Sequence, residues 1–313
     1  MAKRGQTADL AGPGRPWLLV ASILGTMLLA GAGMSLVVMW AHHQRPASTT
    51  GVSTDLSQVA ASDPLVVVLA GTGAAIPLME ALAAKFAAVD GGAISVQPSI
   101  GSSGGLSALQ DGRIDCALVS RELRPGEKGG HTSLHLADAP VALVAGRRVL
   151  PAQLSASQLA SLYDQETPFW TDGRPVTVFL REKGDSGTSV FAGRFPQFSM
   201  AHARSLKRGS PHVAFTDLEM ERALVSYPRS LGLFDFGTIG LRDLDLSIVQ
   251  VDGLSPQDDL ASYPLVRPVL LVYEQGRKDR LERFLKSICS KDGREFMRAS
   301  GYRPVCREGE VSP

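Results

Sequence analysis

Hydrophobic positions divide the chain into a long uncharged run, a polar spacer and a region of short alternating apolar segments. The run spans residues 17–41 and contains no Asp, Glu, Lys or Arg. Since about 20 mostly apolar residues suffice to cross a bilayer as a helix, the run predicts one N-terminal transmembrane helix. Residues 42–63 lack any helical or strand period and predict a flexible linker.

Charges beside the run predict its orientation. Lys3, Arg4 and Arg15 precede it, so the positive-inside rule places residues 1–16 in the cytoplasm and the rest in the periplasm of a single-pass inner-membrane protein. A cleaved signal peptide is the competing interpretation, but its apolar core is usually only about 7–15 residues long. The run ends in Met39-Trp40-Ala41-His42-His43, which is a poor cleavage context. We therefore expect an uncleaved signal-anchor.

Residues 64–313 alternate between strand-type and helix-type patterns. The short apolar runs are Leu65–Ala70, Ile94–Ile100 and Ile114–Ser120, and the segments with helical spacing are Pro77–Val89 and Leu106–Asp111. This β-α-β-α-β order is typical of a parallel sheet with helices on both faces. Ligands bind such sheets at the carboxyl ends of the strands, so the chemistry is expected in the turns that follow them.

Two glycine-rich turns, Gly71–Pro77 and Gly101–Gly105, lead from predicted strands into helices. Small residues let the backbone approach a ligand, and a helix N-terminus carries unpaired N–H groups with a partial positive charge, which suits an anion. Tight turns also use glycine, and serine is a frequent N-cap, for purely structural reasons. The candidate ligand-binding residues here are Thr72, Gly73, Ser102 and Ser103.

A third candidate, Ser120, ends a predicted strand, and a fourth group lies in the loop after a strand at Val176–Leu180. That loop combines a guanidinium fork, two hydroxyls, a flexible backbone and a carboxylate, a combination that few structural roles require. Its candidate residues are Arg181, Asp185, Ser186, Gly187 and Thr188. Arg121, which follows Ser120, is better explained as a solvated loop charge.

The Asp185 carboxylate has two interpretations. Phosphate near neutral pH still carries a proton, which Asp185 would accept, whereas against sulfate the carboxylate would be left unpaired at a cost of about 1–3 kcal/mol. Alternatively, Asp185 caps the helix that follows. The sequence leaves both open.

Taken in order, the four turns resemble the phosphate-binding family of ABC-transporter substrate-binding proteins, from roughly Leu65 to Val305. The family's Gly-Ser-Ser-Thr, Gly-Ser-Gly, Asp-x-x-x-Ser-Ser/Asp and Arg…Ser-Gly-Thr turns are matched by Gly71–Pro77, Gly101–Gly105, Asp115–Ser120 and Arg181–Thr188. Further family-like segments are Gln153–Leu162, Trp170–Gly173, Ser230–Gly240, Tyr263–Pro268 and Gly301–Val305. Ala74 departs from the family by lacking a hydroxyl, and Ser120 stands where some members have an acid.

The resemblance implies an α/β, two-lobed periplasmic-binding-protein-like fold of type 2, with a ligand between the lobes. Lobe 1 would comprise residues 64–144 and 245–305, and lobe 2 residues 145–244. The implied function is extracytoplasmic binding of phosphate or a similar oxyanion for uptake through an ABC permease. A non-transport module that acts as a sensor or an adaptor for another membrane protein is the alternative, because family members usually diffuse freely or carry lipid.

The net charge and the motifs of the sequence argue against nucleic-acid-binding proteins, enzymes and metal-binding proteins. The formal net charge of +1 offers no field to recruit nucleic acid, so we expect none as a partner. The histidines show no metal-ligand spacing, and Gly71-x-Gly73 lacks the third glycine of a dinucleotide fingerprint, so we expect neither an enzyme nor a metal or cofactor. Cys289 and Cys306 either pair in an oxidising periplasm or stay free thiols, while Cys116 lies in a predicted buried strand.

Overall fold

The structure is a computed structural model that describes residues 66–90, 93–127, 129–147, 153–170, 172–274 and 278–309. The chain divides into two units, Met1–Asp55 and Leu56–Pro313, and the described residues all belong to the second. The predicted cytoplasmic segment, transmembrane helix and linker, residues 1–63, lie outside the described ranges. Within those ranges, no helix combines the length and the apolarity that a bilayer crossing needs.

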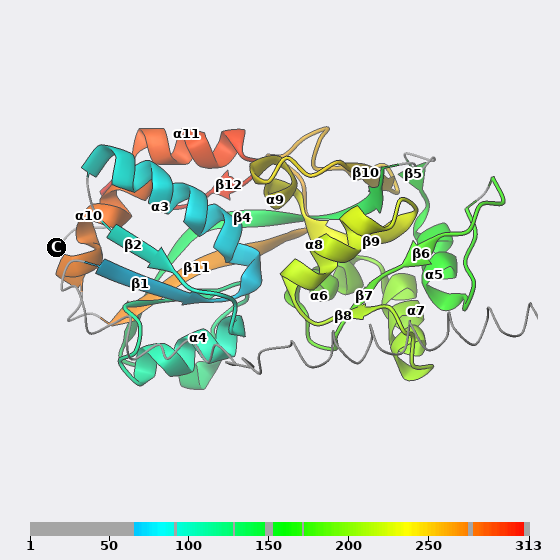
Figure 1. Ribbon diagram of the computed structural model, residues 1–313, viewed down its shortest axis with the longest axis horizontal. Coiled ribbons are helices and arrows are strands. Elements are labelled where there is room, and N and C mark those ends of the chain that lie inside the picture. The colour runs from blue at the N-terminus through cyan, green and yellow to red at the C-terminus, as the bar shows by residue number, and fades with distance from the viewer. Residues whose placement is uncertain are drawn as a thin grey trace, which may run out of the picture. The chain divides into compact units, whose positions relative to one another are not determined.

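The first lobe is a sheet between two layers of helices (Figure 1). Its strands are β1 (Val66–Gly71), β2 (Ala93–Val96), β3 (Cys116–Val119), the first part of β4 (His131–Gly146), β11 (Val266–Glu274) and β12 (Arg303–Pro304). Its helices are η1 (Gly73–Ala75), α3 (Ile76–Asp90), α4 (Gly101–Gln110), η2 (Pro125–Glu127), α10 (Lys278–Cys289) and α11 (Lys291–Ala299). β1 pairs in parallel with β2 and β3, and β11 runs antiparallel between β3 and β4.

The side chains of each strand point alternately to the two faces of the sheet, which explains why helices cover both faces. In β1, Val67 and Leu69 face a core with α3, α10 and α11, whereas Val68 and Ala70 face a second core with α4. Successive strand side chains point to opposite faces, so an uninterrupted apolar strand needs helices on both sides. The predicted parallel sheet with helices on both faces is found here, joined by the antiparallel strands β11 and β4.

The second lobe extends the same sheet through β4. Its strands are β5 (Gln153–Leu154), β6 (Thr177–Val178), β9 (Ser230–Asp235) and β10 (Leu246–Val251), with β7 (Leu180–Arg181) and β8 (Val213–Ala214) in a separate pair. Its helices are α5 (Ala156–Asp164), α6 (Ser186–Arg194), α7 (Pro196–Lys207), α8 (Asp217–Ser226) and α9 (Phe236–Leu241). Leu143 of β4 packs into a core with α5, α6 and α7, and its neighbour Ala142 into a core with α8.

The chain crosses between the lobes within β4 and at the start of β11. Ala139 belongs to the first core and Val141 to the second, so the first crossing lies at Pro140. On the return, Leu265 still packs in the second core, whereas Val269 packs in the first. The predicted boundaries, after 144 and at 245, therefore need correction: β10 pairs with the second-lobe end of β4, which keeps residues 246–265 in that lobe.

Three local predictions differ from the structure. The serines of Gly101–Gly105 were expected in a turn, but α4 already begins at Gly101 and its N-cap Ile100 makes no side-chain cap, so the N-capping alternative for the serines is wrong. The strand expected over Val176–Leu180 is split at Phe179, because β6 pairs with β9 while β7 pairs with β8. The predicted Ile94–Ile100 strand likewise ends at Val96.

A disulfide joins Cys289 at the end of α10 to Cys306 after β12, with 5.6 Å between the Cα atoms. It closes a loop with a sequence separation of 17 that contains α11. Cys116 is a free, buried thiol in β3, as the sequence predicts, and burial raises its pKa far above the usual range. The bond thus fixes the C-terminal segment to the first lobe, and Cys116 takes no part in it.

Reduction of this disulfide is expected to lower the free energy of unfolding by about 3 kcal/mol, because a cross-linked loop of this length restricts the unfolded chain. Urea denaturation with and without dithiothreitol measures the difference. A Cys289→Ser, Cys306→Ser double variant is the control, since its midpoint should not respond to the reductant. An equal midpoint for the oxidised and reduced wild-type protein would contradict the prediction.

Candidate anion-binding site

A cavity of about 570 Å³ lies where the two lobes meet. Eight of the ten candidate residues line it, namely Thr72, Gly73, Ser102, Ser103, Ser120, Arg181, Asp185 and Ser186. Gly187 and Thr188 are buried behind the lining in the first turn of α6. Loops that lie far apart in the sequence therefore meet at one place, as the strand-end argument predicts.

Three helices begin at this cavity. α4 begins at Gly101, α6 at Ser186 and α8 at Asp217, and all three residues line it. Helix N-termini carry a partial positive charge of roughly half a unit and unpaired N–H groups. Asp185 caps α6 and Thr216 caps α8, whereas α4 has no side-chain cap. The α4 terminus thus retains the larger number of donors for a ligand.

A chain of hydroxyl groups crosses the cavity from lobe 1 to lobe 2. The Oγ1 of Thr72 lies 2.9 Å from the Oγ of Ser120, which in turn lies 3.1 Å from the Oγ of Ser186. Arg267 donates from Nη1 to the Ser186 Oγ at 3.0 Å. Because hydroxyls rotate to donate or accept, this chain can turn several donors toward an anion.

Arg181 is a buried cation that lines the cavity, and its guanidinium group does not use all of its hydrogen-bond donors. Its side chain is 8% exposed and faces Asp185, Glu182 and Asp217 at 3.3, 3.4 and 3.6 Å, distances of ion pairs. The Nε atom is buried and faces the Glu182 Oε2 at 3.4 Å, but neither atom has a hydrogen-bond partner among the described residues. An unsatisfied buried donor costs about 1–3 kcal/mol, and more for a charged group, so a ligand acceptor at this position would be stabilising.

Arg267, in contrast, is fully engaged. It donates from Nε and Nη2 to the two carboxylate oxygens of Asp235 and from Nη2 to Asp217 at 3.2 Å. Burial raises the pKa of Asp235 to about 6, against the pull of the Arg267 guanidinium and with a contribution from the charge of Asp217. This pair lies at the lobe crossing, where Arg267 begins the return of β11.

Asp185 has the geometry of a helix cap. Its Oδ2 accepts from the Thr188 backbone N–H at 2.7 Å and from the Thr188 hydroxyl at 2.8 Å. Burial would raise the pKa of Asp185, but the charges of Arg267 and Arg181 and these hydrogen bonds together hold it below its usual range. The capping alternative therefore describes Asp185, while acceptance of a proton from an anion stays a prediction.

Asp217 is a carboxylate of the cavity that the sequence analysis missed. It comes from the first turn of α8 in lobe 2, and its Oδ1 pairs with both Arg267 and Arg181. A Cβ atom on Gly73 would lie 2.6 Å from the Asp217 Oδ2, so a larger residue at position 73 would require the Asp217 carboxylate to shift. Asp217 thus pairs with the guanidinium groups of Arg181 in lobe 2 and of Arg267 in β11, and it lies beside Gly73 of lobe 1.

The local charge is not net positive, because the two guanidinium groups face the carboxylates of Asp185, Asp217, Asp235 and Glu182. Burial raises the pKa of Glu182, and its Oε2 has no hydrogen-bond partner among the described residues. An anion would therefore be held by directed hydrogen bonds rather than by excess charge.

At the rim, Arg121 donates to both carboxylate oxygens of Glu127, at 2.7 and 2.8 Å, and to the Oγ of Ser103 at 3.1 Å. The hydrogen bonds from Arg121 hold the pKa of Glu127 at about 2. Arg121 is therefore an ion-paired residue that lines the cavity at its rim, and not the solvated loop charge that the sequence predicts.

The cavity was compared with the side-chain sets that serine hydrolases and metal sites use. Gly101–Gly105 has the Gly-x-Ser-x-Gly spacing around Ser103, but Ser103 lies inside a helix turn and no histidine is among the described residues that line the cavity. Within the described ranges, no group of three His, Cys, Asp or Glu side chains is placed to hold a metal ion.

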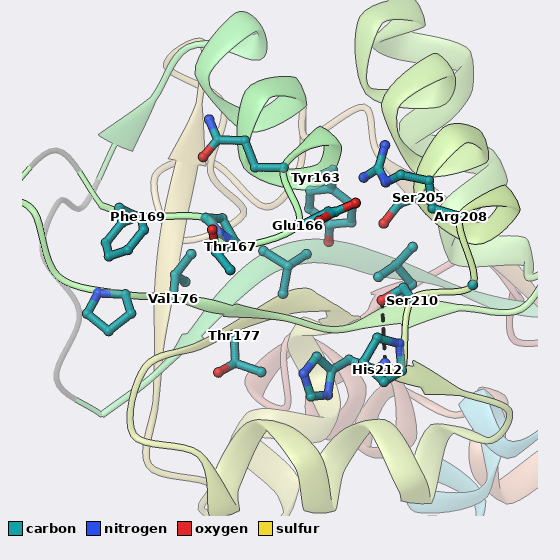
Figure 2. A pocket seen from close by; sticks show the side chains of 17 residues that line it. Tyr163, Glu166, Thr167, Phe169, Val176, Thr177, Ser205, Arg208, Ser210 and His212 are labelled. Carbon is teal, nitrogen blue, oxygen red and sulfur yellow. Dashed lines mark hydrogen bonds between the residues drawn. The ribbon is translucent and has the colours of Figure 1, made fainter.

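A second cavity, of about 520 Å³, lies within the second lobe between the segment around Phe169 and the residues before β8 (Figure 2). Its arginine, Arg208, already donates to Asp164 at 3.0 Å, and none of the candidate residues lines it. Tyr163, His212 and apolar side chains such as Val176 surround it. It therefore lacks the incompletely paired cation that marks the interlobe cavity.

Neither Arg267 nor Asp217 was predicted as a site residue, but the sequence marks Arg267 more clearly than Asp217. Arg267 lies in the family-like segment Tyr263–Pro268, so its motif was visible although its role was not. Asp217 carried no distinct signal, because an acid in the first turn of a helix is common for reasons of the helix dipole alone.

Comparisons with known proteins agree with this architecture. The family model for the PBP superfamily domain matches residues 58–292. No curated protein sequence matches the chain. Similar solved structures include a protein described as a phosphate ABC transporter substrate-binding protein with bound phosphate from Clostridium perfringens, with 22% identity, a TM-score of 0.63, and coverage of 77% of this chain and 99% of that one.

Two further structures have the same fold at lower similarity. One is an ABC-type phosphate transport receptor from Vibrio cholerae, with 21% identity, a TM-score of 0.53, and coverage of 76% of this chain and 99% of that one. The other is the reduced form of OxyR from N. meningitidis, with 14% identity, a TM-score of 0.53, and coverage of 77% and 99%. The predicted two-lobed α/β fold is thus confirmed, and the chain belongs to the family of the PBP superfamily domain.

Proposed function

We propose that the interlobe cavity binds phosphate or a similar oxyanion, with Arg181 as its main charge partner. The observation that carries this proposal is the buried Arg181 guanidinium, whose Nε lacks a hydrogen-bond partner among the described residues in a cavity lined by serine and threonine hydroxyls. A guanidinium fork matches two oxygens of a tetrahedral anion, and such charge-assisted bonds are the strong ones.

The lobes contribute complementary donors. Thr72, Ser102 and Ser120 come from lobe 1, while Arg181 and Ser186 come from lobe 2. Contacts across the boundary, such as the 3.1 Å between the Ser120 and Ser186 hydroxyls, bring both sets together. An anion bound between them would bridge the lobes and favour this closed arrangement over an open one, which is the usual logic of hinged binding proteins.

The cellular role we propose is extracytoplasmic capture of the anion by a protein held in the inner membrane through residues 17–41. Two structural relatives are described as phosphate transport proteins of the ABC type, which supports delivery to an ABC permease. The expected transmembrane anchor supports the alternative, a sensor or adaptor for another membrane protein, because a tethered domain stays beside one partner.

Arg181→Gln is expected to weaken phosphate binding at least tenfold, since charge-assisted hydrogen bonds contribute about 1.5–3 kcal/mol. Isothermal titration of the full-length protein in detergent, dialysed free of phosphate and sulfate, measures the dissociation constant. Arg204→Gln is the matched control, because Arg204 is paired with Asp164 on the surface of lobe 2, outside the cavity lining, and its loss should not change the affinity. Binding that survives Arg181→Gln in a folded variant would refute the proposed site.

Asp217→Asn is expected to tighten the binding of phosphate and of sulfate about threefold or more, because it removes a negative charge from beside both guanidinium groups. The same titration, with both anions, measures the effect. Asp164→Asn on the surface of lobe 2 is the control, since Asp164 lies outside the cavity lining. If phosphate weakened while sulfate tightened, Asp217 would instead accept a hydrogen bond from the protonated anion.

The anchor is tested separately. We expect the full-length protein to remain in the membrane fraction after carbonate extraction, because about 25 uncharged residues exceed the length of a signal-peptide core. Mass spectrometry of the purified chain should find the N-terminal peptide before residue 17, and a deletion of residues 2–45 is the control for loss of the membrane fraction. A mature N-terminus after residue 41 would establish cleavage.

A further inference from the structure

We infer that the preferred ligand of the interlobe cavity is a phosphate monoester with an apolar substituent, rather than free inorganic phosphate. The inference rests on the proposed oxyanion function and specifies the class of molecule that carries the anion. Two observations lead to it: the size of the cavity and the apolar side chains that line it.

The cavity is larger than a simple oxyanion needs. A water molecule takes up about 30 Å³ of liquid, so a five-atom anion needs on the order of 100 Å³. The cavity measures about 570 Å³, which lies in the range of pockets that enclose organic ligands of drug-like size. An inorganic anion at Arg181 would leave most of this volume to water.

Two exposed apolar side chains, one from each lobe, line the otherwise polar cavity. Ile100 precedes α4 in lobe 1 and is 41% exposed, and Phe215 precedes α8 in lobe 2 and is 65% exposed. A single exposed apolar residue needs no explanation, but two that line one cavity from different lobes offer an organic group a surface to cover. The deeper hydroxyls of Thr72 and Ser120 are buried, so the polar end of the cavity lies inside and these side chains lie nearer to solvent.

Charge does not distinguish the two ligands, because a monoester and inorganic phosphate both carry between one and two negative charges near neutral pH. Asp217 and Asp185 already share the two guanidinium groups, so neither ligand gains much from net charge. A monoester keeps three oxygens for Arg181 and the hydroxyls, and its fourth oxygen carries the organic group outward. Burial of that group against Phe215 and Ile100 adds binding energy that inorganic phosphate cannot obtain.

The test is isothermal titration of the full-length protein in detergent with inorganic phosphate, phenyl phosphate and glycerol 3-phosphate. We expect phenyl phosphate to bind about tenfold tighter than inorganic phosphate, because one aromatic ring buries a large apolar area. Glycerol 3-phosphate, whose substituent is polar, should bind no tighter than inorganic phosphate.

Variants locate the apolar contact. Phe215→Ala and Ile100→Ala should each reduce the advantage of phenyl phosphate severalfold and leave the affinity for inorganic phosphate unchanged. Val225→Ala is the matched control, because Val225 lies on the same helix as Asp217, is 50% exposed and does not line the cavity. It should change neither affinity.

The outcomes separate this inference from the proposed function. Inorganic phosphate that binds as tightly as phenyl phosphate, or an advantage of phenyl phosphate that survives both alanine variants, would overturn the ester inference alone. If none of the three compounds binds to a protein that still unfolds cooperatively, both the ester inference and the oxyanion site are overturned.

Discussion

The burial of two guanidinium groups where the lobes meet is the constraint on which the rest of the site depends. A buried cation must be paired or hydrogen-bonded, because an unpaired charge in the interior costs several kcal/mol. Arg267 meets this requirement internally through Asp235, Asp217 and Ser186. Arg181 meets it only in part, since its carboxylate neighbours lie at ion-pair distance and its Nε has no hydrogen-bond partner among the described residues.

The difference between the two arginines divides the cavity into a structural part and a binding part. Arg267 is the second residue of β11, at the crossing, and its hydrogen bonds to Asp235 join that strand to the end of β9. Arg181 ends β7, a short strand that pairs with β8, and lines the same cavity. Asp185 serves both parts, because its cap fixes the first turn of α6 and thereby the position of Ser186.

The sequence predicted what depends on local pattern. The short continuous apolar runs of β1 and β3 and the helical spacing of α3 are visible in the sequence itself, so these segments were correct to within a few residues. The start of α4 was missed because glycine and serine are poor helix formers. Packing decides there: a Cβ on Gly105 would lie 2.9 Å from the Gly71 Cα, so the small residues allow α4 to lie close against β1.

What the sequence could not predict depends on pairing between distant segments. The break at Phe179 arises because its two flanking strands join different partners, and the late return to lobe 1 arises because β10 pairs with β4. Asp217 became part of the site only through the approach of α8 to Gly73, a contact between residues that no local pattern relates. The loops that carry the candidate donors and Asp185 were recognisable in the sequence, whereas Asp217 was not.

The most direct test of this account is a crystal structure of the protein grown with phosphate. The account predicts a tetrahedral anion in the interlobe cavity with oxygens about 2.7–3.2 Å from the Arg181 guanidinium and from hydroxyls of both lobes, consistent with ordinary hydrogen-bond geometry. A well-ordered structure in which Arg181 keeps only its carboxylate neighbours, with the anion bound elsewhere or absent at saturating phosphate, would contradict it.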